Sequence, residues 1–145
     1  MSQMMTPEMQ QFNYLASKID AAYHEAAQKL GLSDSAMLIL YTICNHGEKC
    51  LLSDIRKLSG TSKQTINFAL RKLEAKGVVC LKAAAGRKKM VCLTKNGKVL
   101  ANRTVVRLIT IENDIFSSWP VQERKLYLDL IRKYLTSFQE RIQRL

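Results

Sequence analysis

Residues 61–76 read TSKQTINFALRKLEAK and residues 78–93 read VVCLKAAAGRKKMVCL, and these two stretches decide the fold. In the first stretch, Ile66, Leu70 and Leu73 recur at spacings of three and four, which predicts an amphipathic helix. The second stretch has two β-prone segments on either side of a glycine-containing loop, which predicts a β-hairpin. A short helix expected just upstream makes the whole a helix-turn-helix followed by a β-wing.

Helices are expected on both sides of this central segment. Residues that favour helix starts (Thr6 with Pro7, Ser33, Ser53, Thr94 and Pro120) stand before apolar stretches. The expected helices cover residues 6–30, 36–45, 54–58, 95–117 and 121–142, with a turn at residues 46–49. The predicted fold class is therefore mainly α with a small β-wing.

The start of the central helix has a possible capping box. Thr61 would be the N-cap and Gln64 would stand at N3, where its side chain can return to the N-cap amide. Gln64 would then be occupied by the cap. The alternative is that Gln64 faces a ligand, and the sequence leaves both open.

The positive charge is concentrated in the centre of the chain. Of a net charge of +11, residues 53–98 hold 12 basic and two acidic side chains, whereas the rest holds 11 basic and 10 acidic ones. Such an excess favours a polyanionic partner over a merely solubilising surface. We expect nucleic acid to bind this segment.

The side of the central helix opposite its apolar residues has the chemistry of base contact. Asn and Gln can pair with adenine, Arg with guanine, and an aromatic ring can touch a thymine methyl. Hydroxyl and Lys side chains suit phosphates, and a basic hairpin tip suits the flanking minor groove. The candidate DNA contacts are Ser62, Lys63, Gln64, Thr65, Asn67, Phe68, Arg71, Lys72, Arg87, Lys88 and Lys89.

Composition limits the other function classes. The chain has 145 residues, of which 47% are apolar, yet no apolar run is long enough to span a bilayer. Residues 1–10 lack the apolar core of a signal peptide, so we expect a cytoplasmic protein. With two histidines far from any paired carboxylates, we expect no enzyme and no cofactor.

The four cysteines are expected to be thiols. Cys44, His46 and Cys50 lie close together but lack the paired spacing and fourth ligand of a zinc site, so no metal is expected. Cys80 and Cys92 face each other if the hairpin turns about residues 85–86. They are either two inert thiols or a redox pair whose oxidation would alter the wing.

Taken together, these segments resemble the MarR family of winged-helix transcriptional regulators. The resemblance rests on residues 52–55 (LSDI), 62–67 (SKQTIN), 73–79 (LEAKGVV), and the wing with its exit, 86–97. One departure concerns Arg87, because the family wing usually carries an aspartate just before its arginine and this chain has Ala83, Ala84 and Ala85 there.

The resemblance implies one domain over residues 1–145, with a DNA-binding part at 33–94 and N- and C-terminal dimerisation helices at 6–31 and 95–145. It implies a homodimer that represses from a palindromic operator in double-stranded DNA and is released by a small molecule. Tyr14, Tyr23 and Tyr41 stand on helices beside the cleft that the resemblance implies, where each either lines a pocket or packs in the core or the interface. The long terminal helices independently favour dimerisation, because their apolar faces need a partner. The interface candidates are Met9, Phe12, Leu130, Tyr134, Phe138 and Ile142.

A second function class remains open from the sequence. A winged helix can also serve as an adaptor that binds RNA or protein without contacting bases. The polar row Gln64, Asn67 and Arg71 favours base contact, since an adaptor that recognises charge needs only Lys and Arg.

Overall fold

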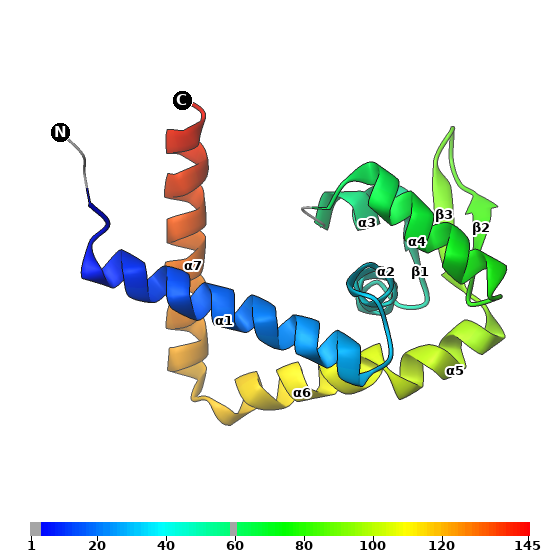
Figure 1. The fold of residues 1–145 in the computed structure, drawn as a ribbon, viewed down its shortest axis with the longest axis horizontal. Helices are drawn as coiled ribbons and strands as arrows, with labels where there is room; N and C mark the ends of the chain where they lie inside the picture. Colours follow the sequence, from blue (N-terminus) through cyan, green and yellow to red (C-terminus); the bar gives the residue numbers. More distant parts are fainter. Residues whose placement is uncertain (1–3, 59–60) are drawn as a thin grey trace. The chain divides into compact units, whose positions relative to one another are not determined.

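The computed structural model describes residues 4–58 and 61–145 (Figure 1). Its helices are α1 (Pro7–Lys29), α2 (Asp34–Asn45), α3 (Leu52–Leu58), α4 (Lys63–Ala75), α5 (Lys95–Arg103), α6 (Val105–Ser118) and α7 (Val121–Ile142). Its strands are β1 (Lys49–Leu51), β2 (Val79–Ala83) and β3 (Lys89–Leu93). The predicted fold class, mainly α with a small β-wing, is confirmed. The chain forms two compact units, one ending at Leu108 and the other covering Ile109–Leu145.

The first unit is organised around α2, which packs against α1, α3, α4, α5, β1 and β3. Its side chains Ile39, Leu40 and Ile43 are completely buried, as are Ile55 of α3 and Ile66 of α4. Burying a large aliphatic side chain contributes about 1.5–3 kcal/mol. This shared core fixes α3 and α4 relative to the wing, and so places the surface that α4 exposes.

The wing is a three-stranded antiparallel sheet with the order β1-β3-β2. The predicted hairpin is confirmed, and Cys80 pairs with Cys92 as the loop position implied. Strand β1 was not predicted. The expected turn is confirmed at residues 46–48 and ends one residue earlier than expected, whereas the expected helix cap at Ser53 was wrong. Lys49 already belongs to β1, and α3 begins at Leu52.

The single helix predicted over residues 95–117 is two helices. Thr104 separates α5 from α6, with a backbone (φ −126°, ψ −94°) outside the helical region. Its buried hydroxyl donates a hydrogen bond to the Leu100 carbonyl at 2.7 Å. Such a bond competes with helical backbone pairing, and the β-branched run Thr104-Val105-Val106 lowers the helix propensity further.

The start of α5 lies against the start of β2. Thr94 is the N-cap, and its hydroxyl accepts a hydrogen bond from the Gly97 amide at 3.0 Å. The Thr94 amide in turn donates to the Val78 carbonyl at 3.1 Å. Gly97 is buried with its Cα facing that carbonyl, and a Cβ there would overlap the Val78 oxygen.

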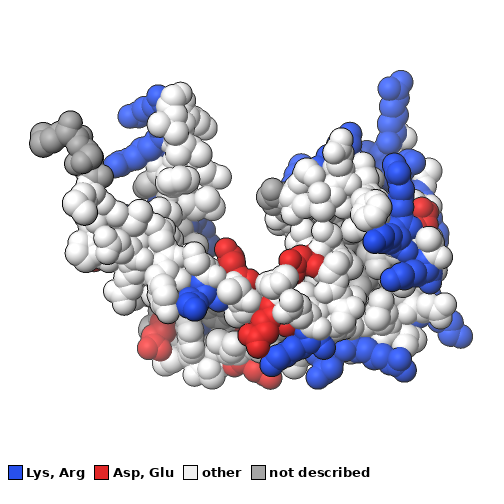
Figure 2. Space-filling view, viewed as in Figure 1, with Lys and Arg blue, Asp and Glu red and all other residues white. Residues whose placement is uncertain are grey.

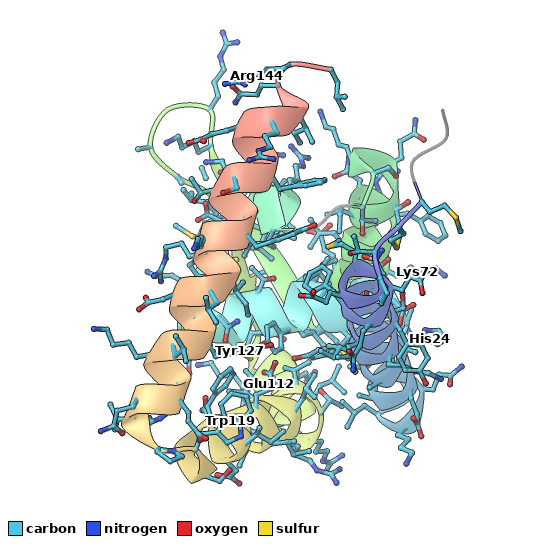
Figure 3. All side chains as sticks on the ribbon, turned by 90° about the vertical axis from the view of Figure 1, so that its left-hand side faces the viewer. His24, Lys72, Glu112, Trp119, Tyr127 and Arg144 are labelled. Carbon is cyan, nitrogen blue, oxygen red and sulfur yellow. The ribbon has the colours of Figure 1, made fainter. Side chains whose placement is uncertain are left out.

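The second unit consists of the end of α6 and the whole of α7. Phe116, Trp119 and Tyr127 form an aromatic cluster, with Trp119 and Tyr127 edge to face at a centroid distance of 5.4 Å (Figure 3). None of the residues that the structure describes in α7 is buried. Among all described helices, none is both long and apolar enough to cross a membrane.

Candidate nucleic-acid interface

The N-terminus of α4 is capped by Ser62, not by Thr61. The Ser62 hydroxyl oxygen accepts from the Thr65 amide at 3.2 Å and lies 2.8 Å from the Thr65 hydroxyl. Gln64 is therefore the second residue of the helix, and the predicted Thr61–Gln64 capping box was wrong. The Gln64 side chain is exposed beside the positive end of the helix dipole, where an anion is favoured.

The outer side of α4 carries an exposed aromatic ring. Phe68 is 62% exposed, and Lys72 Nζ lies 4.5 Å from the centre of its ring. Lys63, Gln64 and Thr65 are exposed on the first turn of the same helix. A Lys ammonium above an aromatic face is attracted by the ring quadrupole, so Lys72 and Phe68 form one composite contact surface.

A basic groove lies between α3, α4 and the wing. It has a volume of about 580 Å³, and among its described lining residues Glu74 is the single acid. Figure 2 shows Lys and Arg side chains gathered over α4, α5 and the wing. The cations that line the basic groove are Arg56, Arg71, Arg87, Lys88 and Lys89. Five cations around one groove create a strongly positive potential that attracts phosphates.

Asn67 and Arg56 make a direct contact inside this groove. Arg56 Nη2 donates a hydrogen bond to Asn67 Oδ1 at 3.0 Å, joining α3 to α4. Asn67 is half-buried rather than fully outward. Asn67 was predicted from sequence as a base contact, but Arg56 was missed, because residues 11 positions apart on separate helices share no local pattern.

The wing tip exposes its three basic residues. Gly86 turns the chain with φ +69°, a left-handed conformation that favours glycine, and the Ala84 amide donates to the Lys88 carbonyl at 2.9 Å. Arg87, Lys88 and Lys89 are all exposed and line both the basic groove and a second hollow along β2. The structure thus brings the wing cations to the same groove as Asn67 and Arg71.

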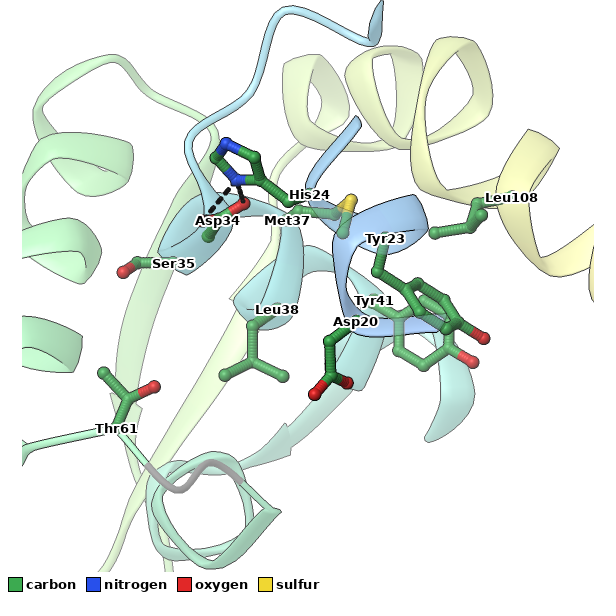
Figure 4. A pocket seen from close by; sticks show the side chains of 10 residues that line it. All are labelled: Asp20, Tyr23, His24, Asp34, Ser35, Met37, Leu38, Tyr41, Thr61 and Leu108. Atoms are coloured by element: carbon green, nitrogen blue, oxygen red, sulfur yellow. Dashed lines mark hydrogen bonds and ion pairs between the residues drawn. The ribbon is translucent and has the colours of Figure 1, made fainter. Parts of the chain in front are cut away.

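A separate cavity of about 380 Å³ lies between α1, α2 and the first turn of α6 (Figure 4). His24 of α1 contacts Asp34 of α2 there, with Nδ1 2.8 Å from Oδ2. Of the three tyrosines considered from sequence, Tyr23 and Tyr41 line this cavity, and Tyr14 is not among its described lining residues. Its described lining holds Asp20 and Asp34 but no Lys or Arg, so the cavity disfavours anions.

The four cysteines are free thiols in different surroundings. Burial and, less strongly, nearby Asp54 and Cys92 raise the pKa of Cys50 to about 11. Burial and then Glu48 raise the pKa of Cys44. Cys80 and Cys92 are half-buried. No group of three or more His, Cys, Asp or Glu side chains suited to a metal ion occurs in the described part of the chain.

The residues predicted to form a dimer interface are almost all accessible. Met9 is half-buried, and the other five expose between 42% and 54% of their surface. On α7, Tyr134 and Phe138 stack with ring planes 12° apart and centroids separated by 5.8 Å. An apolar helix face of this extent is unusual for a monomer.

Comparisons with known proteins bear on the same segments. Residues 30–89 match the family model of the MarR family, which confirms the expected resemblance over α2, α3, α4 and β2. A search of curated proteins found no match. A MarR family regulator from Neisseria meningitidis shares the fold with a TM-score of 0.77 at 18% identity, over 94% of this chain and 96% of that one.

Two further structures share the fold. BpsR of Bordetella bronchiseptica, whose DNA binding is regulated by 6-hydroxynicotinic acid, has a TM-score of 0.62 at 22% identity, over 86% of this chain and 98% of BpsR. PcaV of Streptomyces coelicolor, solved in complex with its natural ligand, has a TM-score of 0.61 at 16% identity, over 92% of this chain and 98% of PcaV. The fold is therefore that of MarR family regulators.

Proposed function

Because residues 30–89 match the MarR family model, we propose that this protein is a sequence-specific DNA-binding transcriptional regulator. It acts as a homodimeric repressor at a palindromic operator and has no enzymatic role. The observation that carries the proposal is the basic groove, in which Asn67 and Arg71 of α4 stand beside the cations of the wing. Phosphate-binding cations and base-contacting side chains on one surface are what sequence recognition requires.

Docking follows from the same geometry. The first turns of α4 would enter the major groove with Lys63, Gln64 and Phe68, while Ser62 and Thr65 lie at the phosphate-facing helix end. The wing would then contact the sugar-phosphate backbone of the DNA beside the adjacent minor groove. In a homodimer two such helices meet successive major grooves, which is why the expected operator is palindromic.

Fluorescence anisotropy tests the proposal directly. The protein is titrated with DNA from upstream of its own gene, with a library of genomic fragments, and with scrambled duplexes, over a series of salt concentrations. We expect a preference of about a thousandfold for a specific duplex and a steep salt dependence. Equal binding to every duplex, including all genomic fragments, would instead indicate an adaptor that recognises only charge.

Arg71→Ala is expected to weaken operator binding by about 1–3 kcal/mol and to relax base preference at one operator position. The reason is that Arg71 is exposed on α4 and lines the basic groove, where its guanidinium can pair with guanine. Anisotropy with the operator and with single-base variants measures both effects. An equal loss on operator and scrambled DNA would refute base contact by Arg71.

Lys88→Ala is the matched control, since it removes one positive charge from the same groove at the wing. We expect it to weaken binding to all duplexes about equally and to lower the salt slope by about one. A change in base preference would contradict a phosphate-only role for Lys88.

Release by a small molecule is the regulatory part of the proposal. The cavity between α1 and α2 is large enough for an aromatic molecule. BpsR, whose DNA binding is regulated by 6-hydroxynicotinic acid, and PcaV, solved in complex with its natural ligand, supply the analogy. Because Asp20 and Asp34 line it and its described lining holds no Lys or Arg, a neutral or cationic ligand fits better than an aromatic acid.

Oxidation of the wing is expected to join Cys80 to Cys92. In an antiparallel hairpin every second residue pair is joined by backbone hydrogen bonds, and the pairs Val78–Thr94 and Ala84–Lys88 are joined in this way. Cys80 and Cys92 are opposite each other in the same alternation, so they too form a hydrogen-bonded pair. The Cα atoms of such a pair are about 5.5 Å apart, which lies within the range of a disulfide. Diamide would take two hydrogens and two electrons from the thiols. Peptide mapping should find this disulfide in the wild type and not in Cys80→Ser.

The Cys50 thiol should resist alkylation at neutral pH, because its raised pKa keeps it protonated below about pH 11. Rapid modification of Cys50 by an alkylating reagent would contradict the raised pKa.

A further inference from the structure

We infer that Arg56 decides which bases Asn67 can contact, by fixing the Asn67 amide as a hydrogen-bond donor. This inference rests on the proposed function, because it concerns base contact by α4. Arg56 is thereby a positioning residue that the MarR resemblance did not indicate. Its role follows from one hydrogen bond, between Arg56 Nη2 and Asn67 Oδ1 at 3.0 Å.

The orientation of the Asn67 amide follows from the chemistry of its partner. The oxygen and nitrogen of an amide have nearly the same shape, so surroundings decide which atom lies where. A guanidinium has only N–H donors and never accepts a hydrogen bond. The atom that faces Arg56 must therefore be the Asn67 oxygen, and the Asn67 nitrogen, with its two hydrogens, is turned the other way.

The contact lies where a base would be met. Arg56 and Asn67 both line the basic groove, and Arg71 lines it one helical turn further along α4. Both partners are half-buried, which limits competition by water. A hydrogen bond to a charged donor is also stronger than one between neutral groups. Asn67 is therefore held in one orientation before DNA arrives.

An amide held in this way distinguishes between bases. Pairing with adenine uses both the amide oxygen and the amide nitrogen, because adenine presents a donor and an acceptor in the major groove. Adenine could use only the second lone pair of an oxygen that already accepts from a guanidinium, which restricts the direction of that contact. Guanine presents two acceptors and thymine presents one, and both can be met by the two N–H donors of the Asn67 amide without that oxygen. The adenine contact expected from sequence is thereby replaced by guanine or thymine.

Selection from a randomised duplex library tests the inference. The operator position contacted by Asn67 is the one at which Asn67→Ala loses base preference. At that position we expect the wild type to favour guanine or thymine over adenine about tenfold. Arg56→Met, which keeps the length but removes every donor, should raise the adenine frequency about tenfold there and nowhere else. In the Asn67→Ala background the same change should leave base preference unaltered.

Two control variants separate positioning from charge. Arg56→Lys keeps a donor-only cation and should retain the wild-type preference. Lys57→Met removes a positive charge from an exposed neighbour on α3 that does not line the groove, and should change no base preference. Wild-type selection of adenine at the Asn67 position would overturn the inference. So would an Arg56→Met variant that weakens all sequences equally.

A measurement without DNA distinguishes failure of this inference from failure of the proposed function. Nitrogen-15 relaxation of the Asn67 side-chain amide, assigned by its loss in Asn67→Ala, reports its order in the free protein. The amide should be ordered in the wild type and in Arg56→Lys, and mobile in Arg56→Met. Equal mobility in all three would overturn the positioning role. An ordered amide with no sequence preference in the selection would overturn base contact and the proposed function together.

Discussion

Replacing Gly97 with alanine is expected to lower the free energy of unfolding by about 3 kcal/mol, at the upper end of the usual cost of overpacking. The added methyl group would overlap the Val78 carbonyl oxygen, with the Leu93 side chain 3.2 Å away. That carbonyl cannot move freely, because it accepts the Thr94 amide at 3.1 Å. The start of α5 would have to move away from β2, which disturbs both the cap and the base of the wing.

The direction in which Gly97→Ala changes the free energy of unfolding is informative. Without the overlap, alanine would stabilise a helix by roughly 0.5–1 kcal/mol relative to glycine. Urea titration followed by circular dichroism measures the change, and Asn96→Ala is the control because Asn96 is exposed on the same turn of α5. We expect that control to stay within about 0.5 kcal/mol of the wild type. A Gly97→Ala variant as stable as the wild type would show that α5 does not lie this close to β2.

Phe138→Glu is expected to convert the proposed dimer into a monomer and to weaken operator binding by about 100-fold or more. Phe138 is half exposed and stacked on Tyr134, on a helix without a buried residue among those described. A carboxylate on that face could be buried only at a high desolvation cost. Loss of the second subunit would then remove the avidity that links two half-sites.

The control places the same charge on the other side of the helix. Gln139 is exposed and is the next residue along α7, so Gln139→Glu has the same added charge about 100° around the helix axis. Light scattering after size exclusion should give a dimer mass for the wild type and Gln139→Glu, and half that mass for Phe138→Glu. A Phe138→Glu protein with the wild-type mass would rule out this face of α7 as the interface.

The parts of the fold that were predictable from sequence are those with local periodicity. The apolar spacing of Ile66, Leu70 and Leu73 predicted α4, and all three side chains are buried. The position of Gly86 predicted the hairpin register, down to the pairing of Cys80 with Cys92. Both patterns involve residues that are close together in the sequence, within one helix or one hairpin, so they can be recognised without knowing the tertiary contacts.

The parts that were missed depend on distant partners. Strand β1 has three residues, too few for a pattern, and it forms because Glu48 and β3 lie side by side, with the Leu93 amide donating to the Glu48 carbonyl. The break at Thr104 comes from a buried hydroxyl, and threonine occurs within many helices. The contacts of Arg56 with Asn67 and of His24 with Asp34 each join two elements. For the site, sequence predicted which side chains are basic and exposed, but not which of them orients another.

The aromatic cluster of the second unit has a practical consequence for spectroscopy. Trp119 is the chain's single tryptophan, and it contacts Phe116 and Tyr127 near the junction of α6 and α7. Its fluorescence therefore comes entirely from residues 109–145, whereas circular dichroism averages over every helix. Comparing the two signals in one denaturation series resolves whether the two units unfold together or in succession. The protein thus carries its own fluorescent label beside α7, one of the two helices that we propose form the dimer interface.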